Sequence, residues 1–172
     1  TIHMINAIKE QIILLDQANE AYYESNALAM IDQVKTISLL FNTFESIEPK
    51  PLYYIGHNVF SLLNEEKSLN ILSLTDSFSP DADPTSTQIQ QMLNEIMTSN
   101  TTVVYFDPLE TLNLANTVKA DLNSKGYQIT LLPLYSMHNI SKKQYESNET
   151  LITLWQANYD NILTGYNLGD IQ

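Results

Sequence analysis

From residue 51 onward, short runs of β-branched and aromatic residues alternate with amphipathic segments of helical spacing. The runs at 52–55, 69–74, 102–106 and 128–132 are typical of strands. The short connections between them leave room for about one helix each, which favours parallel pairing with crossover helices on both faces of the sheet. We therefore predict an α/β fold, with a four-stranded parallel sheet flanked by helices.

Apolar residues at positions i, i+3, i+4 and i+7 predict the helices of this region. The clearest one carries Ile89, Met92, Leu93, Ile96 and Met97, and Asp83-Pro84-Thr85 supplies its N-cap and the proline of its first turn. Gly126 is expected to cap the C-terminal end of a helix at 112–122. Further helices are predicted around Phe60 and Leu63 and across 151–165.

The first 48 residues carry helical spacing and no strand signal. A helix begins at once, is interrupted at 16–19 by Asp-Gln-Ala-Asn, and then resumes with one apolar stripe of about five turns. Pro49 ends it. We predict that 1–48 is a long spanning helix, broken near 16–19, and that 51–172 is a separate α/β lobe. Because the helix begins so abruptly, we expect the chain to be a fragment of a longer protein.

The composition argues against several classes of function. All eight basic residues are lysines, and twenty carboxylates give a formal net charge of −12. This charge repels phosphate backbones, so no nucleic acid is expected as a partner. The four glycines form no phosphate-binding loop, and the absence of cysteine removes thiolate metal sites and cysteine nucleophiles. No apolar run reaches the ~20 residues of a membrane span.

Three polar residues are predicted to lie where ligands gather in open parallel sheets, beyond the carboxyl ends of the strands. His57 follows the first strand, Asp107 follows the third, and His138 follows the fourth. Neutral imidazole is a common metal ligand, and two imidazoles could form half of a tetrahedral zinc shell. Ordinary capping or packing roles for both histidines stay open. Asp107 could act as a general base, or it could cap a turn.

Two further acidic positions, Asp81 and Asp83, look like a chelating pair, but their place before Pro84 favours helix capping. The remaining histidine, His3, is expected to be a solvated residue on a helix. These residues are therefore not assigned to the candidate metal site.

Four segments carry motifs that occur together in one known family. Residues 16–19 and 23–27 resemble its Asp-Pro-x-Asn…Tyr-x-x-Asn-Ala stretch, with glutamine in place of proline. Residues 56–63 resemble its His-Asp-Ala-Phe-x-Tyr-Phe segment, 79–85 its Ser-Pro-Glu-x-Glu-Pro-Ser signature, and 104–108 its Val-x-Phe-x-Glu strand end. In this order the segments resemble the C-terminal lobe and interlobe helix of metal-binding ABC-transporter solute-binding proteins of the zinc/manganese type.

The resemblance implies that the chain captures a divalent transition metal outside the cytoplasmic membrane and passes it to an ABC permease. It implies a lipid-anchored or periplasmic protein without enzymatic activity. It also implies that the other metal ligands lie in an N-terminal lobe, which this chain lacks. The fragment alone is therefore expected to bind metal weakly.

The resemblance makes His57 the first metal ligand of this lobe. Many relatives carry a carboxylate in the loop after the last strand, where this chain has Leu-Tyr-Ser-Met at 134–137. Tyr135 keeps its proton near neutral pH and Met137 is a soft donor, so neither is a good substitute. His138 is adjacent, and the Ser-x-His-Asn arrangement at 136–139 resembles a branch of the family in which a histidine serves here, so the resemblance makes His138 the second ligand. Replacing a carboxylate by imidazole favours zinc over manganese.

Two alternative functions stay open. The fold could serve as an adhesin or a degenerate interaction module without a functional metal site, as the missing carboxylate and the missing lobe suggest. It could also be a small hydrolase with His57 as base and Asp107 as its partner, although no nucleophile accompanies them.

Overall fold

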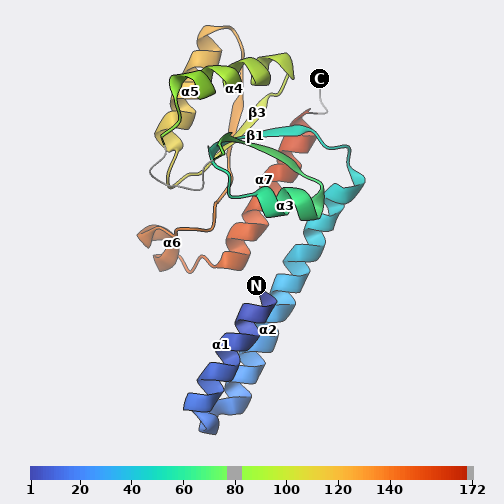
Figure 1. Cartoon of the computed structure of the whole chain (residues 1–172), viewed down its shortest axis with the longest axis vertical. Helices are drawn as coiled ribbons and strands as arrows, with labels where there is room; N and C mark the ends of the chain where they lie inside the picture. The colour runs from blue at the N-terminus through green and yellow to red at the C-terminus, as the bar shows by residue number, and fades with distance from the viewer. Residues whose placement is uncertain (77–82, 170–172) are drawn as a thin grey trace. The chain divides into compact units, whose positions relative to one another are not determined.

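A computed structural model describes residues 1–76 and 83–169 of the chain (Figure 1). The chain forms two compact units, Thr1–Thr43 and Phe44–Gln172. The first unit is helical, and the second contains the whole sheet. The sequence pattern had placed the division slightly later, between 48 and 51.

The first unit is a helical hairpin. Helices α1 (Ile2–Leu15) and α2 (Glu20–Leu40) lie side by side and run in opposite directions (Figure 1). A 3-10 turn, η1 (Gln17–Asn19), joins them. The interruption expected at 16–19 is thus a reversal of the chain, and α1 folds back along α2 instead of continuing as one spanning helix.

Asp16 explains why the chain reverses at this point. Its Oδ2 atom accepts a hydrogen bond of 2.8 Å from the Asn19 side chain and one of 2.7 Å from the Tyr23 hydroxyl. These bonds lower the pKa of Asp16, and the Asn19 bond has the larger effect. The hydrogen bond that the Tyr23 hydroxyl donates to Asp16 raises the pKa of Tyr23. The Asp-x-x-Asn…Tyr motif of the sequence therefore forms the polar lock of the hairpin.

The second unit contains a four-stranded sheet with the order β2-β1-β3-β4. The strands are β1 (Pro51–His57), β2 (Asn70–Thr75), β3 (Val103–Phe106) and β4 (Thr130–Pro133). Every adjacent pair is parallel. The predicted parallel α/β fold is confirmed, with each strand within a few residues of its expected place.

Five helices accompany the sheet in the described part of this unit. Four of them lie where the apolar spacing predicts them. They are α3 (Ser61–Lys67), α4 (Ser86–Thr98), α5 (Leu112–Ser124) and α7 (Leu151–Gly169). The fifth, α6 (Lys142–Glu146), was not predicted, because it has only five residues and no apolar stripe. A reciprocal capping box between Ser141 and Gln144 stabilises it.

The start of α4 differs from the prediction in one detail. Thr85, and not Asp83, is the N-cap: its hydroxyl accepts a hydrogen bond from the Gln88 amide, and the Gln88 side chain accepts one from the Thr85 amide. Pro84 therefore precedes the cap. Asp83 is free of the capping role that the sequence favoured for it.

The sheet is covered on both faces, as expected (Figure 1). One face packs against α4 and α5. Its core residues are Tyr53, Ile55, Leu74, Val104 and Phe106 from the strands, with Met92, Leu93, Ile96, Ala115, Val118 and Leu122 from the helices. The alternate strand residues face α3 and α7. Tyr54 contacts the ring of Phe60 at 5.0 Å between centroids, and the hydroxyl of Tyr105 donates to the carbonyl of Asn161.

Strand β2 lies at the edge of the sheet, where its outer backbone groups need partners. At Ile71 the side chain of Asn64 in α3 supplies them: Nδ2 donates to the Ile71 carbonyl at 2.8 Å, and Oδ1 accepts from the Ile71 amide at 2.9 Å. Among the residues that the model describes, no helix combines the length and the apolar character needed to cross a membrane.

Candidate functional site

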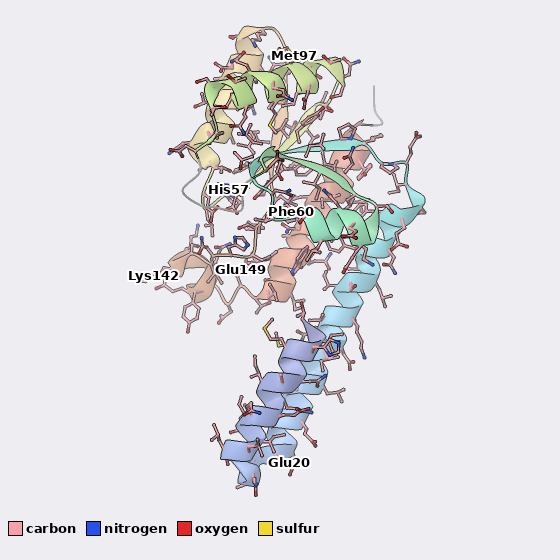
Figure 2. All side chains as sticks on the ribbon, in the orientation of Figure 1. Glu20, His57, Phe60, Met97, Lys142 and Glu149 are labelled. Atoms are coloured by element: carbon pink, nitrogen blue, oxygen red, sulfur yellow. The ribbon has the colours of Figure 1, made fainter. Side chains whose placement is uncertain are left out.

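The candidate site lies at the carboxyl edge of the sheet, where four parallel strands end. His57 and Thr75 are the last residues of β1 and β2. Asp107 follows β3 directly, and the loop that carries His138 follows β4. Figure 2 shows His57 at this edge, near the end of its strand. The topology therefore brings both predicted ligands to the same edge of one sheet.

A β-bulge determines where the His57 side chain points. Tyr54 pairs with Ser73 and His57 pairs with Thr75, so two residues of β1, Ile55 and Gly56, lie opposite a single residue of β2. In a regular strand, residues three apart point to opposite faces. The bulge adds one residue and places Tyr54 and His57 on the same face, next to Thr75.

The bulge is stabilised on both sides. A Cβ atom at Gly56 would come within 2.6 Å of Cζ and 2.8 Å of Oη of the Tyr54 ring, which is fully buried, so glycine is required there. The carbonyl of Ile55 accepts a hydrogen bond of 2.6 Å from the Thr111 hydroxyl. Thr111 thereby satisfies a backbone group at the point where the strand leaves regular pairing.

The imidazole of His57 is half-buried and is held at one nitrogen. Its Nδ1 atom lies 3.1 Å from Oγ1 of Thr75, which is buried. In the part of the chain that the structure describes, Nε2 has no hydrogen-bond partner. His57 and Thr75 line a cavity of about 480 Å³. Its other lining residues include the acidic side chains of Asp83 and Glu110.

Asp107 has a structural role at this edge. The residue is only 2% exposed, and its two carboxylate oxygens accept hydrogen bonds from the Leu109 amide at 2.8 Å and the Ser136 amide at 3.2 Å. Both acceptors are thus occupied by backbone donors, which is the turn-capping alternative of the sequence analysis. The Asp107 carboxylate also joins the turn after β3 to the loop after β4.

The loop after β4 is held at several points up to Asn139. The Asn158 side chain of α7, which is fully buried, accepts from the Tyr135 amide at 2.7 Å and donates to the Tyr135 carbonyl at 2.9 Å. Asn161 donates to the Pro133 carbonyl at 2.8 Å, and Asn139 donates to the Glu110 carboxylate at 2.9 Å. His138 lies just before Asn139 and is exposed.

Tyr135 and Met137 lie in the loop where many relatives carry a carboxylate. Partial burial raises the pKa of Tyr135, and the charges of Glu149 and Asp107 raise it further, so the phenol stays protonated near neutral pH. Met137 has a left-handed backbone, with φ of 65°. Neither observation makes these residues better metal ligands than the exposed imidazole of His138.

The metal prediction rests on two histidines, His57 and His138. Within residues 1–76 and 83–169, no three His, Asp or Glu side chains lie close enough to hold one metal ion. Asp81, with the rest of the 79–82 stretch, lies outside the described residues. His3 is exposed on α1, as predicted. The assignment of His57 and His138 as ligands therefore stays a prediction.

Sequence reasoning missed two residues of the site, Thr75 and Glu110. Thr75 ends a strand at the same edge as His57, and this position was the signal that could have identified it. Glu110 lies three residues after Asp107 in the same turn, but only the fold shows that it lines the His57 cavity. Neither residue belongs to a motif that the sequence analysis used.

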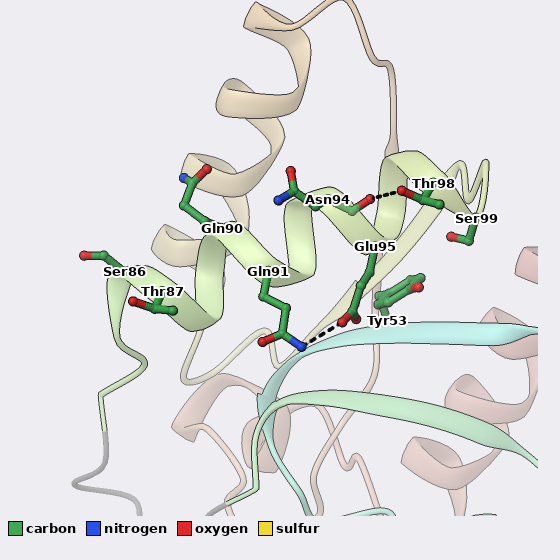
Figure 3. Close-up of a pocket in the computed structure, with 9 residues that line it drawn as sticks. All are labelled: Tyr53, Ser86, Thr87, Gln90, Gln91, Asn94, Glu95, Thr98 and Ser99. Atoms are coloured by element: carbon green, nitrogen blue, oxygen red, sulfur yellow. Dashed lines mark hydrogen bonds between the residues drawn. The ribbon is translucent and has the colours of Figure 1, made fainter.

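A second hollow, of about 790 Å³, lies along α4 and away from the strand ends (Figure 3). Amide and hydroxyl side chains line most of it, together with Tyr53 and one carboxylate, Glu95, which accepts a hydrogen bond of 2.9 Å from Gln91. None of the described residues that line this hollow is a histidine. It therefore has a different chemistry from the cavity at His57.

Comparisons with known proteins agree with the fold. The family model described as "Zinc-uptake complex component A periplasmic" (ZnuA) matches residues 1–165. The high-affinity zinc uptake system protein ZnuA of Bacillus subtilis (strain 168) is 22% identical over 156 residues, which are 91% of this chain and 47% of that protein. The chain thus spans about half the length of this relative.

Two solved structures show the same fold. The Zn(II)-bound ZnuA-like domain of Streptococcus pneumoniae AdcA superimposes with a TM-score of 0.72 at 16% identity, over 95% of this chain and 59% of that one. The periplasmic zinc-binding protein TroA from Treponema pallidum gives a TM-score of 0.75 at 13% identity, over 93% and 58% of the two chains.

Proposed function

The chain belongs to the family of periplasmic zinc-uptake complex component A proteins, and from this premise we propose that it supplies part of a zinc-binding site of an ABC-type uptake system. In this proposal His57 and His138 are the ligands that this chain provides. The observation that carries it is the placement of His57: a bulge directs the ring into a cavity, and one of its nitrogens has no partner among the described residues.

Zinc is the proposed cargo because of the donor type. Imidazole nitrogen suits zinc, whereas manganese prefers oxygen ligands. The cavity at His57 also contains the carboxylates of Asp83 and Glu110, which make it attractive to a cation. These carboxylates would increase the local concentration of a divalent ion, and the imidazoles would provide the selectivity.

Two histidines do not complete a tetrahedral zinc shell. The chain spans about half of its relatives, and we propose that the remaining ligands come from polypeptide equivalent to the other half. The 172-residue chain alone should then bind zinc weakly. Transport requires capture and release without a chemical step, so no catalytic activity is proposed. Delivery to an ABC permease outside the cytoplasmic membrane completes the proposed role.

A zinc titration monitored by NMR of the ¹⁵N-labelled imidazoles tests the ligand assignment, because it detects weak binding to individual residues. We expect zinc to shift the signals of His57 and His138 at concentrations that leave His3 unchanged. His57→Ala and His138→Ala should each remove the response of the other histidine. His3→Ala is the matched control and should leave both responses intact.

The same experiment addresses the alternative of an interaction module without a metal site. If zinc shifts all three histidines equally, or if His57→Ala leaves the response of His138 unchanged, the two residues do not share an ion. The interaction module would then be the better description of this chain.

A further inference from the structure

We infer that Thr75 is a positioning residue for zinc: its hydroxyl accepts the Nδ1 proton of His57 and leaves Nε2 as the metal-binding atom. This inference rests on the proposed function, since it concerns the same histidine. It adds a residue, an atom and a tautomer that the ligand assignment alone does not specify.

The chemistry of the imidazole ring limits which of its nitrogens can bind a metal. A neutral imidazole carries one proton on two nitrogens, and a metal binds only the nitrogen without the proton. The partner of the other nitrogen therefore decides which atom is available. In this protein Oγ1 of Thr75 lies 3.1 Å from Nδ1, at hydrogen-bond distance. A proton held at Nδ1 by this bond leaves the Nε2 lone pair open.

The geometry of the strands brings the imidazole of His57 to the hydroxyl of Thr75. If β1 ran as a regular, unbulged strand from Tyr54 to His57, His57 would point to the opposite face and could not meet Thr75. The contact is therefore a product of the bulge, where Gly56 leaves room for the Tyr54 ring and the Thr111 hydroxyl bonds the Ile55 carbonyl. Thr75 is buried at the end of its strand, so its hydroxyl has little freedom to turn toward water.

The direction of Nε2 follows from the contact at Nδ1. The two ring nitrogens lie on different edges of the imidazole, so anchoring Nδ1 at β2 directs Nε2 away from β2. His57 and Thr75 both line the cavity of about 480 Å³ that also contains Asp83 and Glu110. An ion in this cavity would meet Nε2, and the Thr75 contact would limit rotation of the ring. The imidazole would thus be preorganised, and less conformational entropy would be lost when the ion binds.

The tautomer of His57 in the metal-free chain is the first readout. Long-range ¹H–¹⁵N NMR distinguishes a protonated from an unprotonated ring nitrogen, and exposed His3 provides an internal reference. We expect the proton on Nδ1 in the wild-type chain. Thr75→Val, which keeps the shape and removes the hydroxyl, should give a mixture like that of His3, and Thr75→Ser should restore the Nδ1 form. A proton on Nε2 in the wild type, or no change in Thr75→Val, overturns the inference.

Zinc affinity is the second readout. Loss of an outer partner of a metal-binding histidine typically weakens metal affinity by roughly 10–100-fold. We expect a loss in this range for Thr75→Val, recovery in Thr75→Ser, and none in Thr130→Val, an exposed threonine at the start of β4. Urea unfolding of all three variants separates a change in affinity from a loss of fold.

The outcomes also separate this inference from the proposed function. If His57→Ala retains the zinc response, the ligand assignment fails and the role of Thr75 in zinc binding fails with it. If His57→Ala loses the response but a folded Thr75→Val binds zinc as tightly as the wild type, only the inference about Thr75 fails.

Discussion

Asn158 and Tyr135 are joined by two hydrogen bonds, one on each side of the Asn158 amide. The oxygen accepts from the Tyr135 backbone amide and the nitrogen donates to the Tyr135 carbonyl. The Asn158 side chain therefore pairs with the backbone of Tyr135 as a neighbouring strand would. The Asn64 side chain forms the same two bonds with the backbone of Ile71. In this manner α7 fixes the loop that leads to His138.

The first prediction concerns this clamp. Asn158→Leu should lower the free energy of unfolding by about 2–4 kcal/mol, because two partly buried backbone groups of Tyr135 lose their partners. Urea unfolding measures the loss. Asn94→Leu, at an exposed position on α4, is the control and should stay within about 0.5 kcal/mol of the wild type. Equal losses in the two variants would mean that the Asn158 bonds contribute little.

The second prediction concerns the bulge at the end of β1. Gly56→Ala should lower the free energy of unfolding by about 1–3 kcal/mol, since the added Cβ collides with the buried Tyr54 ring. It should also weaken the response of His57 to zinc, because the strand must shift to relieve the collision and this shift moves the His57 imidazole away from Thr75. Urea unfolding and the NMR titration measure the two effects.

Tyr54→Leu provides the test of this mechanism, because it removes the ring that Gly56 accommodates. The cost of Gly56→Ala should be smaller in a Tyr54→Leu background than in the wild type. An unchanged cost would show that the collision with Tyr54 is not the cause.

The third prediction concerns a close contact between α7 and β3. Replacing glycine by alanine inside a helix normally stabilises the helix by about 1 kcal/mol. At Gly165, however, a Cβ would overlap the Tyr105 hydroxyl and lie 3.0 Å from its Cζ. Gly165→Ala should therefore destabilise the chain, by about 1–3 kcal/mol. Removing the hydroxyl with Tyr105→Phe should reduce this cost, and a double-mutant cycle in urea should give a coupling of about 1 kcal/mol.

The fourth prediction is a pH dependence of the hairpin lock. The pKa of Asp16 is lowered from 3.8, chiefly by its bond with Asn19 and then by its bond with Tyr23. A lowered pKa means that the lock stabilises the hairpin above pH 3.8 and that this contribution is lost as the pH falls through the folded pKa. ¹³C NMR of the Asp16 carboxyl should show a midpoint below 3.8.

The Asp16–Tyr23 hydrogen bond also gives the hairpin a pH dependence at high pH, through the titration of Tyr23. The pKa of Tyr23 is raised from 10.0, mainly by its hydrogen bond to Asp16, so its contribution is present below pH 10.0 and is lost as the pH rises through the raised value. Asp16→Asn should lower the pKa of Tyr23 toward 10.0. Asp32→Asn, on the same helix as Tyr23, should leave it unchanged. An unaltered Tyr23 midpoint in Asp16→Asn would contradict the lock.

The parallel sheet and four of its helices could be predicted because their signals are local. A buried strand such as β3 shows its apolar run directly, and α4 shows its apolar stripe. The reversal at 16–19 was harder, because the break was visible but its geometry depends on the hydroxyl of Tyr23 seven residues away from Asp16. The helix α6 was missed because a capping box stabilises it without an apolar face.

The candidate site was predicted less completely, for a physical reason. The sequence identified the residues that follow strands, His57, Asp107 and His138, but their roles depend on contacts that are distant along the chain. Asp107 accepts from Ser136, 29 residues later, and His57 meets Thr75, 18 residues later. The bulge is visible only when β1 and β2 are aligned, since it is a difference in residue count between two strands.

The extra residue of β1 shows that the direction of the imidazole is set by how β1 pairs with β2, and not by the length of β1 alone. Deleting Gly56 would leave one residue between Tyr54 and the histidine, so an unbulged strand would still present both side chains on one face, opposite Ser73 and Thr75. Keeping both residues in an unbulged strand would instead turn the imidazole toward the side of Leu74, among hydrocarbon. Related chains that differ by one residue at this point can therefore present the same imidazole, a tolerance that substitution patterns alone would not reveal.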